Sequence, residues 1–200
     1  MSETHVSRAL PSIAMLGVGS MGGAILAGLR APGVRVDGPI AVTTRTAEAA
    51  ARFAGAADVT AEAHEVDPAA NRRAVRMARI VVLGVKPWLV HEVVSDIAAE
   101  LAPGTVLVSI AAGVTTASIE ALVPDGVSVV RAMPNTPAHI GRGVTGLAGG
   151  ASATAAEVDR ARALFETVGL VLVVDESQLN AVTGVSGSGP AYLFLYAEEM

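Results

Sequence analysis

The chain has 200 residues, 52% hydrophobic and 3% aromatic, with a formal net charge of −5, so its core is built from aliphatic side chains. This length suits one domain with room for a small second one, and the absence of a basic block argues against a nucleic-acid or anionic-membrane partner. Without cysteine, disulfides and thiolate sites are excluded, and no apolar run is long enough to span a bilayer, so we expect a soluble, cytoplasmic protein.

The first residues show no targeting signal, and the rest of the chain alternates between two kinds of element. Residues 1–11 lack the apolar segment of a signal peptide and are expected to form a flexible tail. After them, short β-branched runs alternate with alanine-rich helical stretches, which indicates a mostly parallel sheet covered by helices on both faces. We therefore predict a doubly wound, Rossmann-type α/β domain over residues 12–175. Strands are expected at 13–16, 40–43, near 59, 80–85, 106–110, 127–131, 144–147 and 170–174, and helices at 21–29, 47–54, 71–77, 89–101, 116–122 and 155–168.

A glycine-rich turn joins the first strand to the first helix. The stretch MLGVGSMGGAI spaces its glycines as G-x-G-x-x-G, at Gly17, Gly19 and Gly22. Such glycines permit a tight turn, close approach of a pyrophosphate and close helix–strand packing. The N–H groups of Ser20 and Met21 would then face the anion at the helix start. Because strand and helix flank the motif as it requires, it predicts a dinucleotide site.

The end of the second strand indicates which dinucleotide binds. An NAD site needs an acidic residue there for the ribose 2′-hydroxyl, but none occurs between Pro39 and Ala47. Thr43 and Thr44 offer hydroxyl groups instead, and Arg45 offers a guanidinium that suits a 2′-phosphate. The alternative is a polar strand end with a solvated arginine. NADPH is therefore the preferred cofactor, with NADH possible.

The only lysine, Lys86, follows an apolar strand and precedes a proline in GVKPW. A catalytic lysine needs a lowered pKa, and nothing in this stretch supplies the neighbouring cation that would lower it. We expect a cofactor contact at the carboxyl end of a central strand, the alternative being a surface lysine. Trp88 is expected to pack the following helix onto the sheet.

Other candidate groups point to no metal and no nucleophile. The histidines His64, His91 and His139 lack paired ligand spacing, and Ser186 and Ser188 have no accompanying base. After Val174 the sequence becomes polar, then rich in Gly and Ser, and finally an apolar helix. That helix, in residues 176–200, either packs against another subunit or belongs to a longer, truncated domain.

From about residue 13 onward the chain resembles the pyrroline-5-carboxylate reductases. The resemblance lies in GVGSMGGAI, GVKPW, SIAAGVT, RAMPNTPA and AVTGVSGSGPAYLF. It implies NADPH-dependent reduction of a cyclic imine to L-proline in proline biosynthesis, and self-association through C-terminal helices whose interlocking forms the substrate site. Residues 176–200 would then begin a helical dimerisation domain.

The resemblance also assigns individual residues. It implies phosphate contacts at 17–22, 2′-phosphate contacts at Thr44 and Arg45, and an adenosine contact at Asn71. It places the nicotinamide half near Val85, Lys86, Pro87, Ala112 and Asn135, and the substrate near Glu176. It assigns no catalytic side chain.

Two departures from the family pattern accompany this resemblance. The segment between residues 59 and 71 looks longer than the family's loop, and the family's later substrate loop is absent, so we expect a truncated chain. Three alternatives stay open. These are another NADP-dependent imine reductase, a β-hydroxyacid oxidoreductase, and a cofactor-binding fragment without turnover. A β-hydroxyacid enzyme of that type uses a lysine after the nucleotide domain, and this chain has none there.

Overall fold

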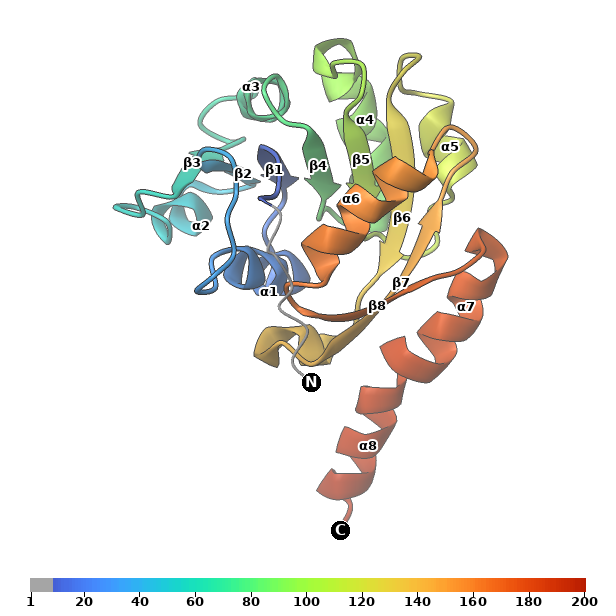
Figure 1. Cartoon of the computed structure of the whole chain (residues 1–200). Helices are drawn as coiled ribbons and strands as arrows, with labels where there is room; N and C mark the ends of the chain where they lie inside the picture. Colours follow the sequence, from blue (N-terminus) through green and yellow to red (C-terminus); the bar gives the residue numbers. More distant parts are fainter. Residues whose placement is uncertain (1–8) are drawn as a thin grey trace.

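The computed structural model describes residues 9–200 and shows one eight-stranded sheet with helices on both faces (Figure 1). The strand order is β3-β2-β1-β4-β5-β6-β7-β8. Neighbours from β3 through β6 are parallel, β7 runs antiparallel to β6, and β8 is parallel to β7. The strands are β1 (Ile13–Leu16), β2 (Ile40–Thr44), β3 (Val59–Ala63), β4 (Ile80–Leu83), β5 (Val106–Ser109), β6 (Ser128–Met133), β7 (Gly143–Gly149) and β8 (Gly169–Val173). The predicted doubly wound, mostly parallel sheet is confirmed.

The helices divide the core into two layers. One cluster of buried side chains joins the sheet to α1 (Ser20–Leu29) and α6 (Ala155–Phe165). The other joins it to α3 (Ala70–Val75), α4 (Val90–Ile97) and α5 (Thr116–Glu120). The short helix α2 (Ala47–Ala51) connects β2 to β3.

The burial of each strand follows from its place in the sheet. Every residue of β1, β4 and β5 is buried, because these central strands have helices on both faces. This is why they read as continuous apolar runs rather than alternating ones. The edge strand β8 is different: Leu170 is 72% exposed and Leu172 55%.

Two expectations near the ends of elements need correction. Leu10 falls within the expected tail, yet it is 5% exposed and forms a parallel bridge with Val36. Residues 1–8 of that predicted tail lie outside the described residues. Trp88 does not pack a helix onto the sheet, because it is 76% exposed. It belongs to a short 3₁₀ turn, η1 (Pro87–Leu89), that precedes α4 and turns its indole outward.

The C-terminal segment leaves the sheet at one end. After the turn η4 (Glu176–Gln178), α7 (Leu179–Val182) covers β7 at Gly146, where a β-carbon would lie 2.9 Å from the side chain of Val182. A π-helical turn, η5 (Thr183–Gly187), leads into α8 (Gly189–Glu198), which extends away from the domain (Figure 1). Among the described residues, no helix is long and apolar enough to cross a membrane.

Candidate functional site

Three chain segments meet at backbone distance around the glycine turn. Gly17 has φ +84°, and its N–H donates to the carbonyl oxygen of Thr43 at 3.0 Å. A β-carbon on Gly22 would lie 2.9 Å from the Gly17 carbonyl oxygen, and one on Gly84 would overlap the same oxygen. The close packing predicted for Gly22 is therefore present, and Gly84 is a further member that the sequence analysis missed. Its signal was a glycine between a buried strand and the lysine.

The start of α1 is open to a ligand. Gly19 and Ser20 are exposed, and a β-carbon on Gly19 would meet no atom within 4 Å. No side chain caps the helix, and its first internal bond runs from the Gly23 N–H to the Gly19 carbonyl at 2.8 Å. The first-turn N–H groups, including that of Met21, therefore remain available to an anion. This geometry fits the pyrophosphate of a dinucleotide.

At the end of β2, some polar side chains are hydrogen-bonded to the protein, and one exposed cation is not. Thr44 is buried and its hydroxyl donates to the Thr46 carbonyl at 2.9 Å. Arg45 is exposed, and within residues 9–200 its guanidinium has no hydrogen bond or ion pair. Asn71 is buried inside α3, where its amide oxygen accepts from the Thr43 hydroxyl at 2.7 Å. Asn71 therefore braces the strand end next to Arg45.

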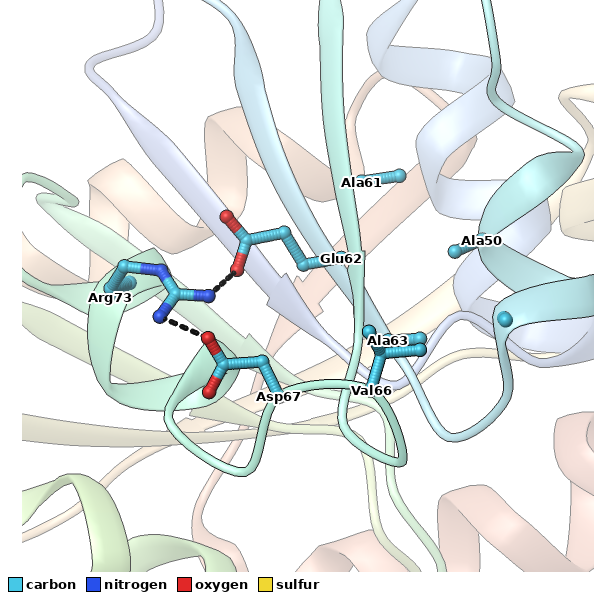
Figure 2. Close-up of a pocket in the computed structure, with 8 residues that line it drawn as sticks. Ala50, Ala61, Glu62, Ala63, Val66, Asp67 and Arg73 are labelled. Atoms are coloured by element: carbon cyan, nitrogen blue, oxygen red, sulfur yellow. Dashed lines mark hydrogen bonds and ion pairs between the residues drawn. The ribbon is translucent and has the colours of Figure 1, made fainter.

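A shallow hollow lies beside this strand end, along the edge strand β3 (Figure 2). Alanines from α2 and β3 line one side of it. On the other side Arg73 reaches toward two carboxylates, those of Glu62 and Asp67, and lies 2.6 Å from Asp67. The hydrogen bond from the Ala69 N–H to its carboxylate lowers the pKa of Asp67 most, and the contact with Arg73 lowers it further. Because Arg73 is already neutralised, Arg45 is the better partner for a 2′-phosphate.

The lysine segment lies at the same edge of the sheet. Gly84 donates to the Leu16 carbonyl at 2.8 Å, which ties the end of β4 to the end of β1. Lys86 then leaves the strand in extended conformation, exposed, with Pro87 as the first residue of the following turn. Its ammonium group has no partner among the described residues. Val85 is half-buried below it.

Two further predicted residues follow the next strands. Ala112 is exposed in the loop after β5. Asn135, after β6, is 7% exposed and bridges two segments: its amide nitrogen donates to the Ser186 carbonyl at 2.9 Å, and its amide oxygen accepts from the Val144 N–H at 2.8 Å. Asn135 thus fastens the C-terminal segment to this edge of the sheet, a role that the sequence did not indicate.

Glu176 is held by protein groups on both carboxylate oxygens. One accepts from the Thr116 N–H at 2.8 Å and from Arg131 at 3.2 Å, and the other accepts from the Thr116 hydroxyl at 2.6 Å. Burial raises the pKa of Glu176, but these hydrogen bonds outweigh it and the net pKa is lowered. Arg131 is a buried charge that the sequence analysis missed, although an arginine inside the apolar run SVVRAM is a visible signal.

The structure gathers most predicted residues but leaves one apart. The glycine turn, Arg45, Lys86, Ala112 and Asn135 all follow the carboxyl ends of parallel strands, where open α/β sheets bind ligands. Glu176 is the exception. It precedes α7, whereas Ser186, which contacts Asn135, lies after α7 in the turn η5. Among the described residues, no group of three or more acidic or histidine side chains is placed to hold a metal ion.

Comparisons with known proteins identify relatives of this chain. Residues 12–113 match the family described as NADP oxidoreductase, coenzyme F420-dependent. Pyrroline-5-carboxylate reductase of Pseudomonas aeruginosa is 42% identical over 95% of the chain and 67% of its own length, and that of Mycobacterium tuberculosis is 42% identical over 94% and 63%. The chain thus spans about two thirds of the length of these relatives.

Solved structures give the same picture. A pyrroline-5-carboxylate reductase from Coxiella burnetii aligns with a TM-score of 0.83 and 34% identity, covering 94% of this chain and 68% of that one. The Plasmodium falciparum pyrroline carboxylate reductase, solved with NADP bound, aligns with a TM-score of 0.78 at 22% identity over 94% of this chain and 66% of that one, and shows the shared fold.

Proposed function

The chain belongs to the pyrroline-5-carboxylate reductase family, and from this premise we propose that the protein reduces 1-pyrroline-5-carboxylate to L-proline with NADPH, the last step of proline biosynthesis. The carbon–nitrogen double bond of the substrate gains a hydride at carbon and a proton at nitrogen. NADPH supplies the hydride when it is bound. The proposal places this activity in the cytoplasm.

One observation carries the cofactor part of the proposal. The uncapped start of α1 lies at the same sheet edge as two exposed cations, Arg45 and Lys86, whose charged groups have no partner within residues 9–200. The helix start suits the pyrophosphate, Arg45 suits the 2′-phosphate, and Lys86 suits a ribose or phosphate oxygen of the nicotinamide half. Thr44 and Asn71 hold the strand end that presents Arg45. NADH remains a possible substitute, since it lacks only the group assigned to Arg45.

The chemistry needs placement more than reactive side chains. A cyclic iminium is already an electrophile, so no protein nucleophile is required. The protein's contribution is to hold cofactor and substrate face to face and to exclude water between them. We assign no catalytic acid or base. Val85, Pro87, Ala112 and Asn135 would shape the nicotinamide side of the cleft.

Glu176 has a more indirect part in this proposal. Its carboxylate is occupied by Thr116 and Arg131, so any contact with the substrate would share oxygens that are already hydrogen-bonded. We therefore give it the role of fixing the segment that leads to the helical domain. A substrate contact through its free lone pairs is compatible with this role.

The proposal includes self-association through the C-terminal helix. In α8 the large side chains from Tyr192 to Tyr196 are 59–70% exposed, and they lie on every side of the helix. A helix that is apolar all round is stable in water only when other elements cover it. A second copy of the helical region would cover it and would complete the substrate site between subunits.

Turnover with the cyclic imine tests the proposal. We would follow NADPH oxidation with pyrroline-5-carboxylate, using this chain and a version extended at its C-terminus. Turnover by the extended protein alone would make this chain a cofactor-binding portion of the reductase. An extended protein that binds NADPH but never reduces this imine would refute the substrate and favour another imine or β-hydroxyacid substrate.

A further inference from the structure

A histidine lies against the glycine turn. The 3₁₀ turn η3 (Thr136–Ile140) packs beside α1, and both lie at the end of the domain from which α8 departs (Figure 1). Across this contact the Nε2 atom of His139 lies 3.1 Å from the hydroxyl oxygen of Ser20. Both side chains are exposed, and Ser20 is the first residue of the helix whose N–H groups face the proposed pyrophosphate.

The charged residues nearest to His139 in the sequence, Arg131 and Arg142, are both positive. Neither α1 (SMGGAILAGL) nor β7 (GVTGLAG), the elements that pack most extensively on η3, contains an ionisable side chain. Arg142 follows η3 in the chain. Arg52 donates to the carbonyl oxygen of Val18, which lies within the glycine turn, at 3.5 Å. No carboxylate of these elements is available to neutralise a protonated imidazole, whereas a bound phosphate would do so.

The protonation state of His139 decides what Ser20 can offer a ligand. Where Nε2 carries no proton, it accepts the Ser20 hydroxyl hydrogen, and the hydroxyl then presents only lone pairs to an anion. In the imidazolium, Nε2–H must donate to the hydroxyl oxygen. The hydroxyl hydrogen is then free to donate to a phosphate oxygen. Protonation therefore adds a positive charge to the turn and, where the neutral ring carries its proton on Nδ1, frees the Ser20 hydroxyl as a hydrogen-bond donor.

We propose that His139 is a positioning residue of the dinucleotide site, which orients the Ser20 hydroxyl and makes cofactor affinity rise as the pH falls. This inference rests on the proposed cofactor site. An anion that binds the imidazolium more tightly than the neutral ring must bind more tightly as the pH falls. For an exposed charge near a helix start, the expected gain in affinity is about two- to fivefold, and salt weakens it.

Calorimetric titration with NADP⁺ between about pH 8 and about pH 5.5 tests this inference. We would compare the wild-type chain with His139→Gln, which keeps a polar side chain that cannot become charged, and with His139→Leu. A matched control exists in His91, whose Nε2 lies 3.1 Å from the Ser118 hydroxyl on the α4–α5 side of the sheet. The 2′-phosphate of the ligand also titrates in this range, but its contribution cancels when proteins are compared.

The expected result is that wild type and His91→Leu gain about two- to fivefold more affinity at low pH than either His139 variant. The same pH dependence in His139→Gln as in wild type would overturn the inference while leaving the cofactor site intact. Loss of the dependence in His91→Leu would also overturn it. A wild-type chain that binds no NADP⁺ at any pH would refute the cofactor site itself, and this inference with it.

Discussion

Replacing Arg45 with alanine should separate the two nicotinamide cofactors. The guanidinium is exposed and makes no hydrogen bond or ion pair in residues 9–200, so its removal breaks nothing in the free protein. We therefore expect the free energy of unfolding to change by less than about 0.5 kcal/mol. The effect should appear only when a ligand carries a 2′-phosphate.

The size of the effect follows from the exposure of the site. A hydrogen bond to a charged group contributes about 1.5–3 kcal/mol, and solvent screening at an exposed arginine favours the lower half of that range. About 1.5–2 kcal/mol corresponds to a roughly ten- to thirtyfold rise in the dissociation constant for NADPH. NADH lacks the 2′-phosphate, so its dissociation constant should change by less than about twofold.

The assay can use the protein's own fluorescence. Trp88 is the only tryptophan, is 76% exposed, and lies two positions after Lys86, so a bound nicotinamide should alter its emission. Arg35→Ala is a matched control, because this guanidinium is also exposed and has no partner in the described residues, but it lies away from the end of β2. Equal weakening of NADPH and NADH binding in Arg45→Ala, or similar weakening in Arg35→Ala, would refute the reasoning.

Four further substitutions test the packing behind the site by urea denaturation. Gly84→Ala places a β-carbon on the Gly17 carbonyl oxygen and should lower the free energy of unfolding by at least about 2 kcal/mol. Gly19→Ala has open space around it and should lower this free energy by less than about 1 kcal/mol. Similar losses in the two variants would contradict the close approach of Gly84 to Gly17. Glu176→Gln leaves a buried guanidinium without its charge partner and should cost about 2–3 kcal/mol. The folded pKa of this glutamate is lowered, so its contribution to the stability of the fold is complete above its unfolded pKa of about 4.3 and is lost as the pH falls through the folded pKa. The Glu176→Gln variant should therefore lose less stability on acidification than the wild type. Parallel stability profiles of the two proteins against pH would refute this role of Glu176. Asn135→Ala removes two hydrogen bonds from a buried position and should lower the free energy of unfolding by about 1–3 kcal/mol. An unchanged urea midpoint would show that water replaces these hydrogen bonds.

The order of elements was predictable because it depends on local pattern. Apolar runs such as IVVL over 80–83 can only be central strands when helices separate them, and their observed burial is complete. The glycine turn was also predictable, because its strand and helix are its immediate neighbours in the sequence. The missing acid and the arginine at the end of β2 are equally local features. Together they determined the fold class and the type of cofactor site.

The partners of the polar side chains depended on the tertiary structure. Arg131 meets Glu176 across 45 residues, Asn135 meets Ser186 across 51, and Ser20 meets His139 across 119. Such pairs are set by strand order and by how connecting segments cross the sheet, and no local periodicity encodes them. The exposure of Trp88 has the same origin, since a single 3₁₀ turn before α4 decides which way the indole points. The sequence alone thus determined which chemical groups stand at the sheet's edge, and the tertiary structure decided which of them are already bonded and which are free to bind.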